Sequence, residues 1–361
     1  MLAGSLLLVL MVGLAFANGA NDASKGVATL VGAGLGSPGR ALRWGAAATV
    51  AGALAAGLVS QRLVAVFSGS GVLGTVPAGW MFPAAVSAGA TAWLVIATHT
   101  GLPVSTTHAL VGGLVGVGLV AEGFTGIHWT TVAGKVALPL ALSPLLSLGL
   151  LFAVSPPVTG AFRRWNRYCV CLEHHELTLA PATGPSLAAA RELRVLAGDD
   201  CPPRVLTRLN ALDAVHWASA GFASFARALN DAPKVLALGL AGGTALGLSG
   251  GSLIVLVALA MGAGSHLAGR RVTHTLATKV TPIPADHGLA ANLVTSALVG
   301  IASAVAVPVS TTHVSTGAIV GIGMRRHDVR WKVVREFLLA WVVTVPVAAM
   351  LAGGAYAVIA R

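Results

Sequence analysis

Charged side chains are scarce in this sequence. Only 10% of its 361 residues are Asp, Glu, Lys or Arg, whereas 55% are hydrophobic. A soluble fold of this length needs a larger polar surface, so the composition favours a helical protein that crosses the membrane several times. We therefore expect an all-α polytopic protein of the cell membrane, in contact with the lipid bilayer.

Acidic residues are the rarer charged class, with 12 Asp and Glu against 23 Lys and Arg and a formal net charge of +11. In a soluble domain this excess would suggest nucleic acid. Here the basic residues lie mostly in short connections between apolar segments, where they report membrane topology. No nucleic-acid partner is expected.

The chain has only three cysteines, Cys169, Cys171 and Cys201, all in one polar segment. An odd number of cysteines in one segment does not make a disulfide framework. The stretch CVCLEHHE has enough thiol and imidazole groups for zinc, but its spacing matches no established zinc site. We expect no metal site and no cofactor.

The N-terminal segment MLAGSLLLVLMVGLAFA lacks the basic start of a signal peptide, although its apolar core and Ala-Phe-Ala ending resemble one. The polar stretch that follows it recurs later in the chain. The segment is therefore interpreted as part of the fold.

The chain contains an internal repeat. GANDASKGVATLVG at 19–32 returns as ALNDAPKVLALGL at 228–240, and the hexapeptide PVSTTH at 103–108 returns unchanged at 308–313. These markers occur in the same order with similar separations, which coincidence explains poorly.

The repeat predicts two homologous transmembrane halves, 1–155 and 207–361, joined by a polar cytoplasmic linker, 156–206. Basic loops of one half correspond to loops with little or no basic charge in the other. Under the positive-inside rule the halves insert in opposite senses, as in an inverted-repeat transporter, with both termini outside. We expect roughly 10 to 12 membrane segments, including broken or re-entrant helices.

The Asn-Asp segments are costly to place in a membrane. An aspartate near the bilayer centre costs roughly 3 kcal/mol, so it needs a partner or a purpose. Here an aspartate occurs in an apolar segment twice, as Asp22 and Asp231, at equivalent positions of the repeat. The flanking Gly19 and Gly26, and Pro233 in the second copy, suggest helices that break and line a cavity. A single Asn or Asp could instead join helices by hydrogen bonds, but the duplication favours a site.

PVSTTH predicts a second kind of helix interruption. Its proline disfavours helix at the preceding residue, and its Ser and Thr residues are suitable N-caps. Two helix N-termini with hydroxyl donors, facing each other, would surround an oxyanion. The predicted substrate-facing residues here are Ser105, Thr106, Thr107, Ser310, Thr311 and Thr312. The following His108 and His313 are either packing residues or proton carriers.

Together GANDASKG, LNDAPK and the two copies of PVSTTH resemble the inorganic phosphate transporter (PiT) family of secondary carriers. The resemblance covers both halves and leaves out only the linker. It implies an inverted-repeat helical fold, often a homodimer, that carries phosphate with sodium or protons. It also implies that the central site contains Asn21, Asp22, Asn230 and Asp231 in addition to the two Ser-Thr-Thr turns.

Three departures from the family pattern concern the coupling ion. Members commonly have Asn where this chain has Lys25 and Lys234, and His is frequent where Arg227 stands. Members also commonly have an acidic residue in the next helix, where the nearest positions here are Ala51 and Asn292.

We hypothesise that an ammonium group in each half replaces a sodium ion, pairing with Asp22 or Asp231 and balancing the phosphate. A buried lysine can also release a proton during a transport cycle. The expected coupling residues are therefore these aspartates with Lys25 and Lys234. Coupling to H+, or uncoupled exchange, is expected over coupling to Na+. The alternative is that both lysines reach an interface and only anchor their helices.

Other functions leave different signatures. Sulfate is the closest rival substrate, although only phosphate keeps a proton that it can donate to an aspartate. An intramembrane hydrolase would use Ser105 with His108, or Ser310 with His313, as nucleophile and base. Two equivalent copies and no evident orienting group argue against an enzyme. A cation channel lined by the aspartates would conduct without saturation.

Overall fold

The computed structural model describes residues 1–59, 64–65, 67–165, 168–174, 191–197, 205–305, 307 and 309–361. Long apolar runs rich in Ala, Leu and Val form helices there, because a helix satisfies its backbone hydrogen bonds internally. In the first half these are α1 (Leu2–Asp22), α2 (Ser24–Gly32), α3 (Pro38–Val59), α5 (Met81–Thr100), α6 (Thr106–Ala121), α7 (Trp129–Thr131) and α8 (Leu138–Trp165). In the second half they are α9 (Ala211–Ala245), α10 (Gly250–Ala268), α11 (Arg270–Thr278), α12 (Ala285–Ala304), α13 (Thr311–Arg326) and α14 (Trp331–Ile359).

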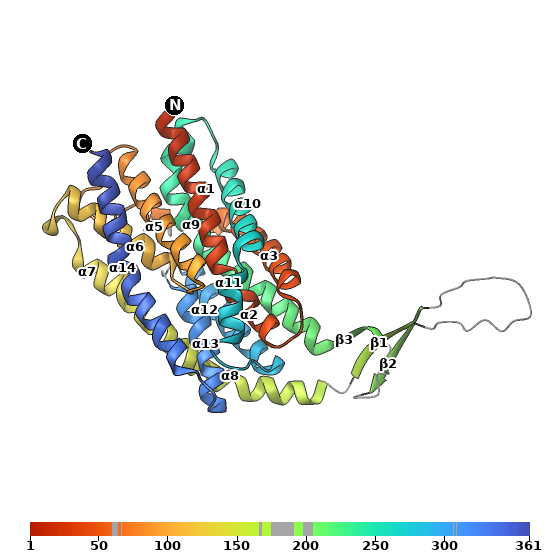
Figure 1. Ribbon diagram of the computed structural model, residues 1–361. Coiled ribbons are helices and arrows are strands. Elements are labelled where there is room, and N and C mark those ends of the chain that lie inside the picture. Colours follow the sequence, from red (N-terminus) through yellow and green to blue (C-terminus); the bar gives the residue numbers. More distant parts are fainter. Residues whose placement is uncertain are drawn as a thin grey trace, which may run out of the picture.

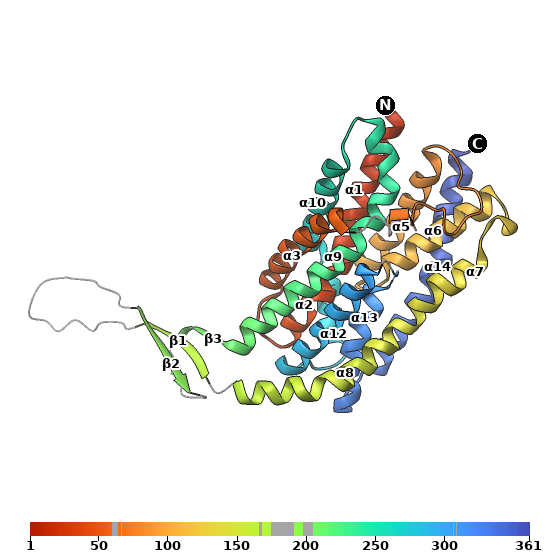
Figure 2. The ribbon, with the colours of Figure 1, turned by 180° about the vertical axis from the view of Figure 1, so that it is seen from behind.

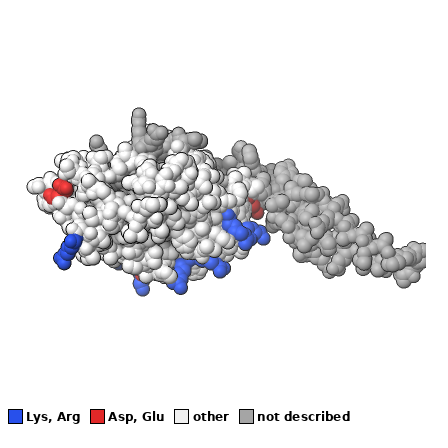
Figure 3. All heavy atoms as spheres, turned by 90° about the horizontal axis from the view of Figure 1, so that it is seen from above, with Lys and Arg blue, Asp and Glu red and all other residues white. Residues whose placement is uncertain are grey.

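Within the described residues, six helical segments are long and apolar enough to cross a membrane: Leu2–Gly32, Met81–Thr100, Trp129–Phe162, Gly250–Ala268, Ala285–Ala304 and Trp331–Ile359. The third includes the π-helical turn Val132–Ala137 and runs along the bundle toward the linker (Figure 2). The N- and C-termini lie at the same end of the molecule (Figure 1), as expected from the sequence. Seen from that end, the surface is mostly uncharged, with the blue Lys and Arg side chains near its edge (Figure 3).

Two helical hairpins carry the PVSTTH segments. The first joins α5 to α6 through a turn at Gly101, whose φ of 76° favours glycine. The second joins α12 to α13. In Figure 1, α5 and α6 lie toward the end with the termini, and α12 and α13 lie toward the opposite end. These hairpins contain the PVSTTH interruptions, and their first helices, α5 and α12, are themselves long enough to cross a membrane; re-entrance of the hairpins stays a prediction.

The two halves are interlocked. The hairpin α5–α6 packs against α14, the last helix of the other half, and the hairpin α12–α13 packs against α8. The first helix of each half also packs against the other half: α1 contacts α10, and α9 contacts α3. Each hairpin thus packs against a helix of the other half as well as against its own half, and the arrangement is the same for both hairpins.

Helix breaks at both Asn-Asp segments were expected, and the second prediction is wrong. The first segment is interrupted only at Ala23, between α1 and α2. The second lies inside α9, which continues through Pro233. Proline is tolerated within membrane helices because neighbouring groups satisfy the backbone that it frees. Gly19 and Gly26 serve close packing, since an added Cβ would lie 2.0 Å from the Met261 carbonyl oxygen and 2.1 Å from Ser224 Oγ.

An antiparallel sheet lies between α8 and α9, with β1 (Tyr168–His174), β2 (Arg191–Ala197) and β3 (Val205–Asn210) in the order β2-β1-β3. Its last strand extends beyond the predicted linker, 156–206, into the second half. These strands were not predicted from the sequence. Cys169 and Cys171 belong to β1, whereas Cys201 lies outside the described residues.

Glycines in α6 allow its close contact with α14. A Cβ at Gly116 would lie 2.1 Å from the Ala349 carbonyl oxygen. Replacing Gly116 by Ala is expected to destabilise the protein by about 1 to 3 kcal/mol, because backbone must move to make room. Thermal unfolding in detergent measures this. Gly13→Ala is the control, since no neighbouring atom of the described residues lies within 4 Å of its added Cβ. Equal melting temperatures for the two variants would contradict the prediction.

Candidate functional site

The two Asn-Asp segments meet in the interior of the bundle, where α1 packs against α9. The four side chains Asn21, Asp22, Asn230 and Asp231 are all buried. Asn21 holds the first hairpin: its Nδ2 donates to the Leu102 carbonyl at 3.0 Å, and its Oδ1 accepts from the backbone N–H of Val104 at 3.1 Å. Asn230 Nδ2 holds the second hairpin by donating to the Val309 carbonyl at 3.3 Å.

Each aspartate is paired with the lysine that follows it by three residues. Lys25 Nζ donates to Asp22 Oδ1, and Lys234 Nζ donates to Asp231 Oδ1 at 2.9 Å. Lys25 is 3% exposed and Lys234 is 0% exposed. The alternative in which the lysines reach an interface is therefore wrong.

Both lysines also contact the hairpin turns. Lys25 Nζ lies 3.3 Å from the Val104 carbonyl oxygen. Lys234 Nζ lies 2.8 Å from Thr107 Oγ1 and 3.5 Å from the Val309 carbonyl oxygen. Each ammonium group thus joins an aspartate to the backbone before a Ser-Thr-Thr sequence, which places it at the predicted oxyanion site.

The Ser-Thr-Thr segments begin helices, as predicted. Ser105 Oγ and Ser310 Oγ each accept from the backbone N–H three residues later, at 3.2 Å in both cases. The helices α6 and α13 start at the threonines Thr106 and Thr311, which are both buried. Because these starts lie beside the lysines, their N-terminal N–H groups add to the positive potential of the cluster.

The two turns also bind each other. Thr107 Oγ1 donates to the Val309 carbonyl at 3.3 Å, and Thr312 Oγ1 donates to the Val104 carbonyl at 2.7 Å. Thr107 and Thr312 are equivalent positions of the repeat, as are Val104 and Val309. The contacts are therefore reciprocal, as a twofold relation between the halves would produce.

Asn18 and Arg227 also lie in this cluster, although they were not predicted as site residues from the sequence. Each precedes its aspartate by four residues, so they are equivalent positions. Arg227 Nη1 donates to Asn18 Oδ1 at 3.2 Å, and Nη2 donates to Thr49 Oγ1 on α3 at 2.7 Å. The available signal was the i, i+4 spacing, which puts both side chains on the same helix face as the aspartates.

Asn18 connects the two carboxylates. Its Nδ2 lies 3.1 Å from Asp22 Oδ2, 3.4 Å from Asp231 Oδ2 and 2.9 Å from Thr106 Oγ1. Thr106 Oγ1 in turn lies 3.4 Å from Asp22 Oδ2. Every carboxylate oxygen of the pair therefore has a donor in the protein.

The charge of this cluster is positive. Three cations, Lys25, Lys234 and Arg227, surround two carboxylates, Asp22 and Asp231, all buried. When all five are ionised, one unit of positive charge remains in a region of low dielectric constant, where it attracts an anion strongly. Among the described residues, no three His, Cys, Asp or Glu side chains come together as metal ligands.

His108 and His313 lie beside each other, with ring centroids 4.6 Å apart and the ring planes tilted by 40°. His313 also stacks on Trp341, and its Nδ1 lies 2.9 Å from the Leu140 carbonyl oxygen. Within the described part of the chain, His108 Nδ1 and His313 Nε2 have no hydrogen-bond partner. Both rings line a cavity of about 430 Å³ between α6, α8, α13 and α14. Their role as a proton relay stays a prediction.

Comparison with known proteins gives one consistent family. The family model described as "Phosphate transporter family" matches residues 18–352. The chain is 30% identical to a protein of Pyrococcus horikoshii named as a phosphate permease, with 96% of this chain and 95% of the relative covered. It is 29% identical to a Rhizobium meliloti protein named as a low-affinity inorganic phosphate transporter, with 94% and 92% covered.

A solved structure titled "The sodium-dependent phosphate transporter" resembles the whole fold. Its TM-score is 0.73, and the alignment covers 100% of this chain and 99% of that one. At 20% identity the likeness concerns the fold alone.

Proposed function

The chain belongs to the phosphate transporter family, and we propose that it moves inorganic phosphate as a secondary carrier coupled to protons rather than to sodium. It is a multi-pass protein of the cell membrane and a carrier, not an enzyme. Family membership therefore argues against the intramembrane hydrolase that Ser105 and His108 suggested.

One observation carries the choice of coupling ion: the carboxylates that could hold a sodium ion already hold ammonium groups. Sodium prefers oxygen ligands, and Asp22 and Asp231 are the only acidic side chains of the buried cluster among the described residues. Each is bonded to its own lysine. A fixed ammonium supplies the positive charge that a bound cation would otherwise bring, and it can exchange a proton with the adjacent carboxylate or with phosphate.

Phosphate fits the positive cluster better than sulfate does. The Ser105 and Ser310 helix starts offer N–H and hydroxyl donors to any tetrahedral anion. Only phosphate retains a proton near neutral pH, and that proton can be donated to Asp22 or Asp231. Sulfate and sodium coupling are the alternatives that an experiment must separate.

Uptake of labelled phosphate into proteoliposomes tests this function, with proton and sodium gradients imposed separately. A pH difference of one unit is worth about 1.4 kcal/mol per proton, so coupling to one proton gives about tenfold accumulation without sodium. Uptake that requires sodium would contradict proton coupling but keep the carrier. Efficient competition by unlabelled sulfate would contradict the substrate, and empty liposomes are the control.

A homodimer is the assembly that the family resemblance implies. Light scattering on the purified protein in detergent would measure its mass. A monomeric mass with full transport activity would contradict it.

A further inference from the structure

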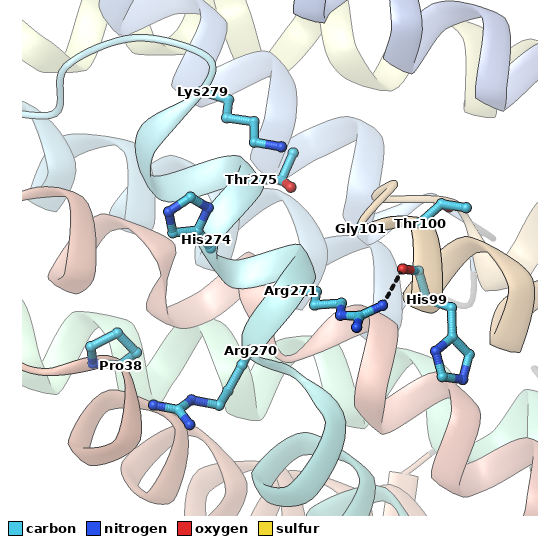
Figure 4. A pocket seen from close by; sticks show the side chains of 9 residues that line it. All are labelled: Pro38, His99, Thr100, Gly101, Arg270, Arg271, His274, Thr275 and Lys279. Atoms are coloured by element: carbon cyan, nitrogen blue, oxygen red, sulfur yellow. Dashed lines mark hydrogen bonds between the residues drawn. The ribbon is translucent and has the colours of Figure 1, made fainter.

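A second polar feature lies outside the buried cluster. It is a cavity of about 510 Å³ between the end of α5, the start of α3 and helix α11 with the residue that follows it (Figure 4). The charged and imidazole groups in its lining are Arg270, Arg271, Lys279, His99 and His274, and no Asp or Glu of the described part of the chain lines it. Such a cavity attracts anions, because side chains of one sign line a concave surface.

The cations of this cavity are available to a ligand. Arg271 Nη1 donates to the carbonyl of His99 at 2.7 Å, a neutral acceptor that fixes the guanidinium group without cancelling its charge (Figure 4). Lys279 extends toward Thr275 in the same view. None of the ion pairs among the described residues includes Arg270, Arg271 or Lys279.

The tip of the first hairpin separates this cavity from the buried cluster. On one side, Thr98 Oγ1 and the Leu102 carbonyl accept from Asn21 Nδ2, at 3.2 and 3.0 Å. On the other side, the intervening residues His99 to Gly101 line the cavity. Only a short length of polypeptide therefore stands between the basic cavity and an Asn-Asp segment.

A neighbouring cavity of about 360 Å³ continues toward α1. It shares His99, Arg270 and Arg271 with the first cavity, and Ala20 and Thr98 also line it. Ala20 directly precedes Asn21. The basic groups thus lead from the surface to the residues next to the proposed phosphate site.

We propose that this cavity, here called the basic vestibule and defined by His99, Arg270, Arg271, His274 and Lys279, binds a phosphate-type oxyanion. The inference rests on the proposed function for its place in transport: it is the site that phosphate occupies between the cytoplasm and the buried cluster. The positive-inside rule predicts this side to be cytoplasmic, because Arg270 and Arg271, at the start of α11, follow an apolar helix long enough to cross a membrane. Arginine's planar fork of donors suits phosphate oxygens.

The phosphate headgroup of an anionic lipid has the same chemistry as free phosphate, so the test must separate the two sources. Thr100, which lines the vestibule and is exposed, is replaced by Cys in a full-length chain whose Cys169, Cys171 and Cys201 are Ser. The rate of its modification by a negatively charged methanethiosulfonate reagent is measured with and without inorganic phosphate, in neutral detergent. Bound phosphate is expected to slow modification about tenfold.

The decisive comparison is between two variants of equal charge change. Arg270→Gln with Arg271→Gln is expected to abolish the protection by phosphate. Lys332→Gln with Arg335→Gln, which removes two exposed cations from α14, is expected to preserve it. Absence of protection in the parent chain, or equal protection in both variants, would overturn the proposal.

Nanodiscs identify the source of the oxyanion. If a lipid headgroup fills the vestibule, phosphatidylglycerol protects position 100 without added phosphate, phosphatidylcholine does not, and the Arg270 and Arg271 variant loses the effect. Protection by free phosphate in phosphatidylcholine assigns the site to the substrate. The assay needs no transport, so protection without phosphate uptake would refute the proposed function and leave the vestibule, whereas uptake without protection would refute the vestibule alone.

Discussion

Phosphate uptake is expected to fall at least about 100-fold when Lys25→Asn and Lys234→Asn are combined, because the buried cluster then changes from a net charge of +1 to −1. Two unit charges 4 Å apart interact by about 4 kcal/mol at an effective dielectric constant of 20. Removing two cations beside the anion is therefore expected to weaken its binding by more than about 100-fold. Transport by purified protein in proteoliposomes measures the effect, and Lys332→Asn on the surface of α14 is the control.

The sodium dependence of this double variant is a second test of the role of the lysines, in addition to its loss of uptake. With the ammonium groups gone, Asp22 and Asp231 have free oxygens for a cation, and added sodium is expected to restore part of the uptake. A double variant that transports normally, with the ion dependence of the parent chain, would contradict the role given to the lysines.

Misfolding is the competing explanation, since an unpaired buried carboxylate costs about 3 to 5 kcal/mol. A second variant separates the two explanations by changing Asp22 and Asp231 to Asn as well. This variant contains neither ion pair, so it is expected to fold, and its cluster retains only Arg227 as a charge. If it folds and transports phosphate as the parent chain does, the ion pairs have no part in transport.

Much of the site could be predicted because the two halves can be aligned with each other, so that residues which recur at equivalent positions can be recognised. Helix starts at Ser105 and Ser310 follow from local capping rules, and the hydrogen bonds that these serines accept confirm them. The burial of Lys25 could not be predicted from composition. A lysine one turn from an aspartate can bond to it or extend to an interface, and only the packing of the hairpin tip decides between them.

Other features depend on contacts between distant parts of the chain. Pro233 predicts a helix break by its local chemistry, yet α9 continues because neighbouring helices support it. The pairing of Asn18 with Arg227 joins residues 209 positions apart. Their equivalence is visible in the repeat, but the sequence does not show that two equivalent positions touch each other across the axis.

Arg227 is the residue whose removal tests that contact. Arg227→Gln is expected to raise the KM for phosphate by about tenfold to 100-fold, because it removes the charge that leaves the cluster positive. It also takes one donor from Asn18 Oδ1 and another from Thr49. Initial rates of phosphate uptake over a range of concentrations, with melting temperatures as a check on folding, provide the measurement.

The charge of Arg227 and its geometry make separable contributions. Arg227→Lys keeps the charge but not the planar fork that reaches Asn18 and Thr49 together. If charge alone binds the anion, this variant retains a KM close to that of the parent chain. If the fork must hold Asn18 between Asp22 and Asp231, the Arg227→Lys variant is impaired in kcat as well as KM, because one of the hydrogen bonds between the two halves is lost. A normal KM for Arg227→Gln would show that the two lysines and the two helix N-termini are sufficient to bind phosphate. Arg227 would then have only a packing role.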